Sequence, residues 1–292
     1  MTENSTTGTV FQSRKFTDFA TVKEALISKE IGGSFILAPL AMQLARDGVP
    51  IKVVYLGHRD GTAIVVGKDS AIRDFADLRG KRVAIPNRHS NQNVLLHKLM
   101  RERGMPFGSL QLIELPPPEH PAALATGSID AYIVGEPFCA KAELDGTGRV
   151  LYFTKDIWPD FISCVLVVRQ DLIEGDRALV QELVDGIAKS GKWLDEELEH
   201  RMDAADVVGK RYYFQPPELL RYVLSRPPDR VRYTQLEPLK EDFDEIMHLA
   251  AEIGVLDGEI AFEEYVDPSF VRPLAELDWG EDPFPPLAGG QE

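Results

Sequence analysis

The chain has 292 residues, 44% of them hydrophobic, and its 32 basic and 47 acidic side chains give a formal net charge of −15. This composition excludes a collagen-like or broadly disordered chain, and no apolar run approaches the roughly 18 residues of a membrane span. The acidic balance argues against nucleic-acid binding, because such a chain gains nothing from counterion release on a phosphate backbone. Most of the excess lies after Thr234, where an acidic helix and tail are expected.

Short β-branched runs alternate with amphipathic stretches, which is typical of βαβ units and predicts an α/β fold. The expected strands are 35–37, 51–56, 62–66, 81–85, 110–115, 132–134, 149–153 and 163–169. The expected helices are 21–30, 40–47, 93–103, 121–126, 137–144, 176–200, 203–213, 216–224 and 238–254. The last twenty or so residues are rich in Pro, Gly and acid, which indicates a weakly ordered tail.

Two runs dense in β-branched residues, TAIVV at 62–66 and CVLVV at 164–168, flank the central block. If they lie side by side, they form two crossings between two lobes, with a cleft at the crossing that can close by hinge motion. The predicted division places lobe I at 1–64 and 166–275 and lobe II at 65–165. Residues 276–292 form an acidic, Pro/Gly-rich tail.

The densest polar cluster of the chain lies between the strand KRVAI and an amphipathic helix. Free N–H groups at a helix start favour an acceptor, so this position is typical of an anion or polar-ligand site. The alternative is a plain helix cap, because Ser and Asn are favoured cap residues. The candidate ligand-binding residues here are Asn87, Arg88, His89, Ser90, Asn91, Gln92 and Asn93.

Three further sets of residues end a predicted strand or lie just before the first crossing, where loops border a cleft. Glu136 and Phe138 follow the strand 132–134, although Glu-Pro is also an ordinary helix start. The set at 58–62 has a surface turn with an ion pair as its alternative. The candidate ligand-binding residues from these sets are Leu37, Ala38, Pro39, His58, Gly61, Thr62, Glu136 and Phe138.

The sequence contains no HExxH or GxSxG motif and no Cys–His pair at a family spacing. Cys139 and Cys164 form neither a CxxC pattern nor a metal-type spacing and are expected to be small apolar packers. We therefore expect no catalytic residue, no metal and no cofactor. The opening MTENSTTGTV lacks the basic and apolar regions of a signal peptide, which predicts a cytoplasmic protein if the chain as written is complete.

The segment 116–138, PPPEHPAALATGSIDAYIVGEPF, resembles the second-lobe segment of substrate-binding proteins of ABC importers. The branch is the nitrate/sulfonate/bicarbonate (SsuA/NMT1/THI5-like) group. FILAPLAMQLARDGVPIKVVYLG at 35–57 is similar to the first-lobe segment, GKRVAIP to the second-lobe entry and CVLVVRQDLI to the return crossing. The resemblance covers about residues 10–225. It implies a type II periplasmic binding-protein fold, with two α/β lobes joined by two crossover strands and the ligand between them.

The resemblance also implies a function and a set of partners. The expected ligand is a small anionic or polar nutrient, either nitrate-, sulfonate- or bicarbonate-like or pyrimidine-like. The expected partners are the permease and ATPase subunits of an importer, and the protein is expected to be monomeric and periplasmic or lipid-anchored. Relatives begin with a strand of the type LxIGY and a helix, and comparison with them predicts that this first βα unit is missing from the sequence as given. The alternatives are an enzyme of the thiamine-pyrimidine or menaquinone-pathway type on the same fold, or a cytosolic ligand sensor.

Overall fold

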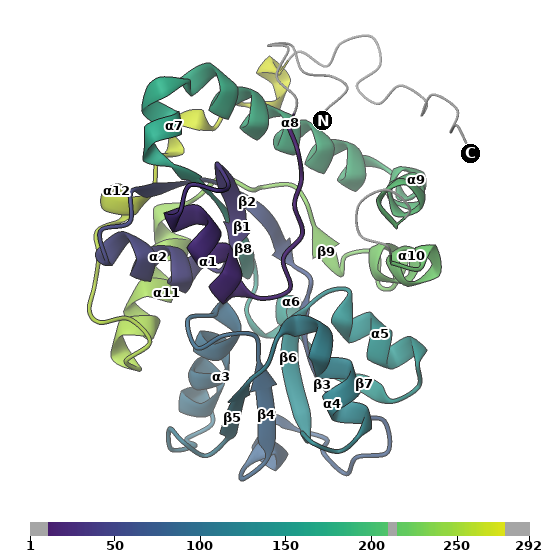
Figure 1. Ribbon diagram of the computed structural model, residues 1–292. Coiled ribbons are helices and arrows are strands. Elements are labelled where there is room, and N and C mark those ends of the chain that lie inside the picture. The colour runs from purple at the N-terminus through teal and green to yellow at the C-terminus, as the bar shows by residue number, and fades with distance from the viewer. Residues whose placement is uncertain (1–10, 210–214, 278–292) are drawn as a thin grey trace.

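The computed structural model describes residues 11–209 and 215–277, which form two β-sheets flanked by helices (Figure 1). The first sheet has the strand order β1-β8-β2-β9, and the second has the order β5-β4-β6-β3-β7. The strands of the first sheet are β1 Gly33–Ile36, β2 Ile51–Asp60, β8 Ile162–Arg169 and β9 Val231–Arg232. Those of the second are β3 Thr62–Gly67, β4 Arg82–Ile85, β5 Gln111–Glu114, β6 Ala131–Gly135 and β7 Gly148–Phe153.

Helices cover both sheets. Lobe I is the first sheet with α1 Phe19–Ile27, α2 Ala38–Arg46, α7 Gln170–Gly175, α8 Arg177–Glu196, α9 Leu198–Val208, α10 Pro217–Ser225, α11 Lys240–Glu252 and α12 Phe262–Tyr265. Lobe II is the second sheet with α3 Asn91–Glu102, α4 His120–Ala125, α5 Phe138–Leu144 and α6 Thr154–Ile157. Short 3₁₀ helices lie at Phe75–Leu78, Pro117–Glu119, Pro268–Phe270 and Leu274–Glu276.

The structure confirms the α/β class, and each expected strand is found within a few residues of its predicted position. The helix expected over 176–200 is interrupted, because Glu197 adopts an extended conformation that ends α8 and starts α9. The strand β9 and the helices α6, α7 and α12 have no counterpart among the elements expected from the sequence. The end of the helix expected at 203–213 and almost all of the predicted tail lie outside the described residues.

The expectation that the runs 62–66 and 164–168 pair side by side is wrong. β3 pairs with β6 and β7 in the second sheet, whereas β8 pairs with β1 and β2 in the first. The reason is a sharp turn between β2 and β3, where Asp60 and Gly61 both have positive φ. The two connections nevertheless meet, because Asp60 N donates to Phe161 O at 2.8 Å and Thr62 Oγ1 lies 3.4 Å from Ser163 Oγ. The chain therefore changes sheet at Gly61 and at about residue 161.

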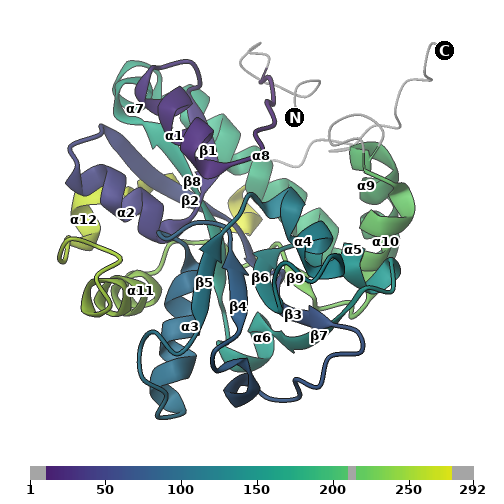
Figure 2. The same cartoon turned by 60° about the horizontal axis from the view of Figure 1, so that its bottom comes forward.

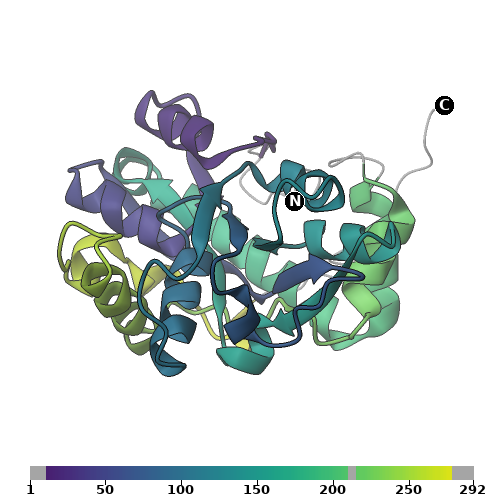
Figure 3. The ribbon, with the colours of Figure 1, turned by 90° about the horizontal axis from the view of Figure 1, so that it is seen from below.

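The hydrophobic core runs through both lobes on the side of α3 and α11. One continuous cluster of buried residues includes Val53 and Phe243 of lobe I and Leu95 of lobe II. Ion pairs also join α3 to α11, and in one of them Lys98 Nζ lies 2.9 Å from Glu245 Oε1. A separate, smaller cluster joins α5 to α9 and α10. Figure 2 shows α11 beside α3 and α10 beside α5, and Figure 3 shows these lobe I helices (yellow-green and green) flanking lobe II on opposite sides.

Candidate ligand-binding site

A groove of about 520 Å³ lies between the lobes and takes its lining from both. Its walls are mainly apolar and aromatic. The lobe I lining is Arg14, Lys15, Phe16, Thr17, Asp18, Phe19, Val22, Ser34, Phe35, His58, Leu194, Ala204, Ala205, Val208, Gln215, Leu220, Val223, Leu224, Val231 and Tyr233. The lobe II lining is Pro117, Pro118, Glu136, Pro137 and Phe138. Such a concave, largely apolar site with a few polar groups is typical of small-molecule binding.

The polar end of the groove lies against Gly61, where the chain passes from β2 to β3. The Glu136 amide donates to the carbonyl of Gly61 at 2.8 Å, which fixes the start of the segment after β6. His58 is also close to this turn, because a Cβ placed on Gly61 would be only 3.2 Å from His58 Cε1. Two candidate residues that are 78 positions apart in the sequence are thus held by the same turn.

Glu136 belongs to a buried group of charges that links the lobes. Its Oε1 lies 2.9 Å from Nε of Arg230, which is 1% exposed, and its Oε2 accepts from the amide of Ala140 in α5 at 3.0 Å. Glu143 pairs with the same guanidinium, which also lies over the ring of Phe153 at 4.8 Å. Burial raises the pKa of Glu136 to about 7, although Arg230 and the Ala140 amide act in the opposite direction. Two carboxylates therefore share one cation.

His58 is the second polar group of the groove. Burial lowers its pKa to about 4, so the imidazole is neutral at pH 7. Its ring centroid is 6.2 Å from that of Tyr233, another lining residue. Within the described residues its Nδ1 is buried without a hydrogen-bond partner. A neutral imidazole in this position is able either to donate or to accept one hydrogen bond.

The predicted polar cluster at 87–93 lies at the contact between the lobes rather than in the lining of the groove. Ser90 is the N-cap of α3, with its Oγ accepting from Asn93 N at 3.0 Å, as the cap alternative expects. Asn91 reaches into lobe I, where Oδ1 accepts from Ala38 N at 3.0 Å and Nδ2 donates to the carbonyl of Ile162. Ser90, Asn91 and Asn93 are all buried. The side chain of Asn91 thus caps α2, which has no cap of its own.

The other residues of this cluster make local contacts. Gln92 Nε2 lies 3.5 Å from Thr62 Oγ1, and Asn93 Nδ2 donates to the carbonyl of Arg88 at 2.8 Å. Asn87 Oδ1 accepts from the amide of His89 at 2.8 Å. Burial, and then the charge of Arg88, lowers the pKa of His89. Arg88 is exposed, Asn87 and His89 are half-buried, and residues 90–93 are buried. The turn at 87–89 therefore faces solvent, whereas the start of α3 faces protein.

Of the residues predicted from the sequence, the groove brings together His58, Glu136 and Phe138. Leu37, Ala38 and Pro39 lie buried at the start of α2, and Gly61 and Thr62 lie at the lobe connection behind the groove. Sequence reasoning missed the segment 14–19, the faces of α9 and α10, and Tyr233. The amphipathic pattern of 216–224 was visible, but it does not tell which of two faces meets a cavity.

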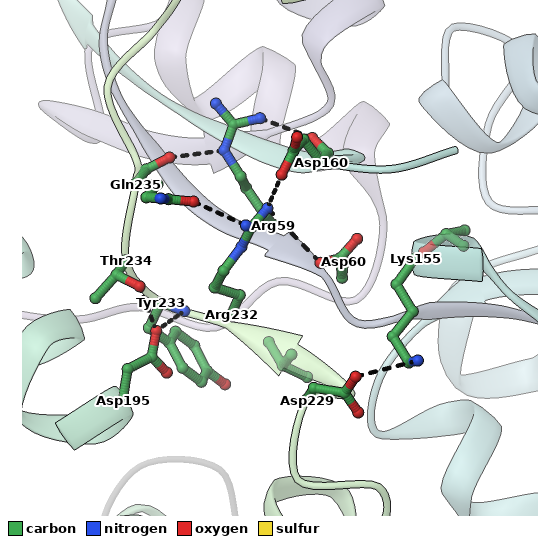
Figure 4. A network of polar contacts seen from close by, with 12 residues as sticks. Arg59, Asp60, Lys155, Asp160, Asp195, Asp229, Arg232, Tyr233, Thr234 and Gln235 are labelled. Carbon is green, nitrogen blue, oxygen red and sulfur yellow. Dashed lines mark hydrogen bonds and ion pairs between the residues drawn. The ribbon is translucent and has the colours of Figure 1, made fainter. Parts of the chain in front are cut away.

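A polar network beside the groove fixes the two lobe connections (Figure 4). The guanidinium of Arg59, 2% exposed, donates to the carbonyls of Gln235 and Asp160 at 2.6 and 2.7 Å. Arg232 forms an ion pair with the Asp160 carboxylate and lies 3.9 Å from Asp60. Burial raises the pKa of Asp60 to about 6, although Arg232 opposes this. The network joins the end of β2 to the segment that leads into β8.

The described residues give little for catalysis or metal binding. Within 11–209 and 215–277 there is no group of three or more His, Cys, Asp or Glu side chains that could hold a metal ion. Burial raises the pKa of the Cys164 thiol to about 12 and that of Cys139 well above its usual value, so both are protonated at neutral pH. No helix in this part of the chain is both long and apolar enough to cross a bilayer.

The two sheets and the groove between them define the fold of periplasmic solute-binding proteins. The nitrate-binding protein NrtA from Synechocystis PCC 6803 superimposes with a TM-score of 0.78 at 17% identity, over 88% of this chain and 77% of its own. The ligand-binding component of an ABC-type import system from Staphylococcus aureus, solved with zinc bound, gives 0.79 at 28% identity, over 91% and 88%. A desulfurization enzyme, DSZB, shares the fold with a TM-score of 0.59 at 15% identity.

Residues 4–209 match the NMT1-like family, and the chain belongs to that family. The taurine-binding periplasmic protein of Escherichia coli is 31% identical over 186 residues, which are 63% of this chain and 56% of that protein. The chain spans less than two thirds of the length of the curated relatives it matches. The resemblance read from residues 35–57 and 116–138 is thereby confirmed.

Proposed function

We propose that this chain is the solute-binding component of an ABC-type importer and holds a small anionic or polar nutrient in the groove between its lobes. The observation that carries the proposal is the groove of about 520 Å³, which is lined from both lobes. Its lining includes His58 and the buried Glu136, and the part of the groove around these two residues is called its buried end. Relatives named for nitrate, sulfonate and taurine binding support the class of ligand. The partners would be a permease and an ATPase, with the protein acting as an extracytoplasmic monomer.

The volume of the groove favours an organic ligand over an inorganic ion. A water molecule takes up about 30 Å³ in the liquid, and nitrate or bicarbonate is only modestly larger. Either ion would leave most of the groove to solvent, against walls that include Phe16, Phe35 and Phe138. Among the ligand classes of the proposal, sulfonate-like and pyrimidine-like molecules fit this apolar lining better, because they carry a body that buries it.

A ligand screen followed by calorimetry tests the proposal. Nitrate, bicarbonate, alkanesulfonates including taurine, and pyrimidines are added singly, and a ligand that binds the native state raises the melting temperature. Phe138→Ala removes a groove wall and is expected to weaken the binding of that ligand about tenfold or more. Phe107→Ala is the matched control, because Phe107 is 49% exposed in lobe II and lies outside the groove. The proposal fails if no compound stabilises the protein, or if both variants bind equally.

Binding without chemical change separates this proposal from an enzyme on the same fold. The protonated thiols of Cys139 and Cys164 favour binding, because the thiolate is the nucleophile in cysteine chemistry. The bound compound is released by denaturation after prolonged incubation and compared with the starting material by mass spectrometry. Recovery of a converted product would identify an enzyme instead. Stimulation of a reconstituted permease–ATPase complex by the loaded protein tests the importer role.

A further inference from the structure

The buried end of the groove holds two carboxyl groups but one guanidinium. Glu136 lines the groove with a side chain that is 6% exposed, and Glu143 shares Arg230 with it. One guanidinium thus faces two carboxylates. The cations in the lining, Arg14 and Lys15, come from the segment that precedes α1 rather than from the buried end. An oxyanion placed against Glu136 would meet a carboxylate in a poorly solvated site, where like charges repel strongly.

Hydrogen-bond partners at this end are also incomplete within the described residues. Glu136 Oε1 and Arg230 Nε lie 2.9 Å apart, but neither atom makes a hydrogen bond of acceptable geometry, so their attraction is that of two charges. His58 Nδ1, in the same lining, is buried without a partner. Both residues are held against Gly61. Buried polar atoms in native proteins are nearly always satisfied, so His58 Nδ1 is a position for a polar group of a ligand, whereas Glu136 Oε1 already faces Arg230.

We propose that the buried end of the groove selects ligands that present an N–H donor or a positively charged nitrogen, and that Glu136 makes this selection. The inference rests on the proposed function of the groove as the ligand site. The ligand's nitrogen would donate to Glu136 and lie beside the neutral imidazole of His58, with the body of the ligand against the aromatic walls. Arg230 would hold the Glu136 carboxyl group in place, with Glu143 paired to the same guanidinium.

Two probes of matched body and opposite charge test this selection. Benzamidine carries a cationic N–H edge and benzoate an anionic oxygen edge on the same flat ring. Calorimetric titration of the full chain is expected to give benzamidine at least about tenfold tighter binding, the range of one charge-assisted hydrogen bond. Glu136→Gln keeps the size and the acceptor for Ala140 and is expected to abolish this preference. Glu174→Gln, the same change on exposed α7, is expected to retain it.

Each outcome of this experiment decides the inference. Equal or tighter binding of benzoate by the parent protein overturns it, as does a preference for benzamidine that survives Glu136→Gln. Absence of binding by either probe also overturns it. The parent comparison stands even if Glu136→Gln does not fold. The proposed function is judged separately by the ligand screen: a sulfonate without an amino group that binds and loses affinity in Phe138→Ala would uphold the groove while refuting the selection by Glu136.

Discussion

Replacement of Asn91 by alanine should destabilise the protein by about 2–5 kcal/mol. The side chain is fully buried, and it joins α3 of lobe II to the amide of Ala38 and the carbonyl of Ile162 in lobe I. Each lost hydrogen bond costs about 1 kcal/mol, and a buried group left without a partner costs about 1–3 kcal/mol. The amide of Ala38 and the carbonyl of Ile162 cannot form hydrogen bonds with water unless the lobes separate. The destabilisation should therefore lie in the upper part of the range of about 2–5 kcal/mol.

Urea denaturation followed by circular dichroism measures this loss, with Asn93→Ala as the matched control. The Asn93 side chain bonds within its own turn, to the Arg88 carbonyl, and its Oδ1 is buried without a partner among the described residues. Removing it should therefore cost no more than about 1 kcal/mol. If Asn91→Ala lowers the free energy of unfolding by less than this control does, Asn91 does not fasten the lobes. Reduced ligand affinity with unchanged stability would instead restore the original interpretation of Asn91 as a ligand residue.

Two further predictions concern the buried charges. Arg230→Met leaves Glu136 and Glu143 without their cation and should lower the free energy of unfolding at pH 8 by about 3–5 kcal/mol, as measured by urea denaturation. This loss of stability should shrink towards pH 5, because Glu136 takes up a proton. A pH-independent loss under about 1 kcal/mol would contradict the pairing. Asp60 has a folded pKa of about 6 against 3.8 as its ordinary value, so the folded state holds the proton more tightly and loses stability as the pH rises from about 4 to about 6. The Asp60→Asn variant lacks this loss, so its free energy of unfolding should rise by roughly 1–2 kcal/mol relative to that of the parent between about pH 4 and pH 6. This gain is smaller than the full pKa shift would give, because the carboxyl group keeps some contact with solvent. Parallel curves of stability against pH for the two proteins would show that Asp60 does not titrate in this range.

Local sequence patterns were sufficient for most of the secondary structure. Strands such as β3 and β8 are short runs of β-branched residues, whose preference for extended backbone is largely local. Their neighbours in the sheets were not predictable in the same way, because two equally apolar runs fit many partners. The positive φ at Asp60, next to Gly61, sends β3 into the other sheet, and only the glycine was a visible signal.

The candidate site shows a different limit. The polar run at 87–93 was recognised, but a helix start needs acceptors from any source, and a ligand oxygen and a protein amide satisfy it equally well. Asn91 fills this role for α2 across the lobe contact, a relationship between residues 53 positions apart that leaves no local trace. Arg230 likewise meets Glu136 from 94 positions away. His58, Glu136 and Phe138 were found because strand ends and lobe connections can be located from the pattern alone.

Residues 62–161 leave and re-enter lobe I at neighbouring points, where Asp60 N donates to Phe161 O and Thr62 Oγ1 lies 3.4 Å from Ser163 Oγ. Such adjacent ends are the usual mark of a module that is tolerated as an insertion or exchanged between hosts. The shared interior works against that independence, because Leu95 belongs to the same apolar cluster as Val53 and Phe243. A lobe II moved into another protein would expose the apolar surface that it now buries against lobe I. A chimaera therefore needs the matching surface of α11 as well as suitable junctions in the chain.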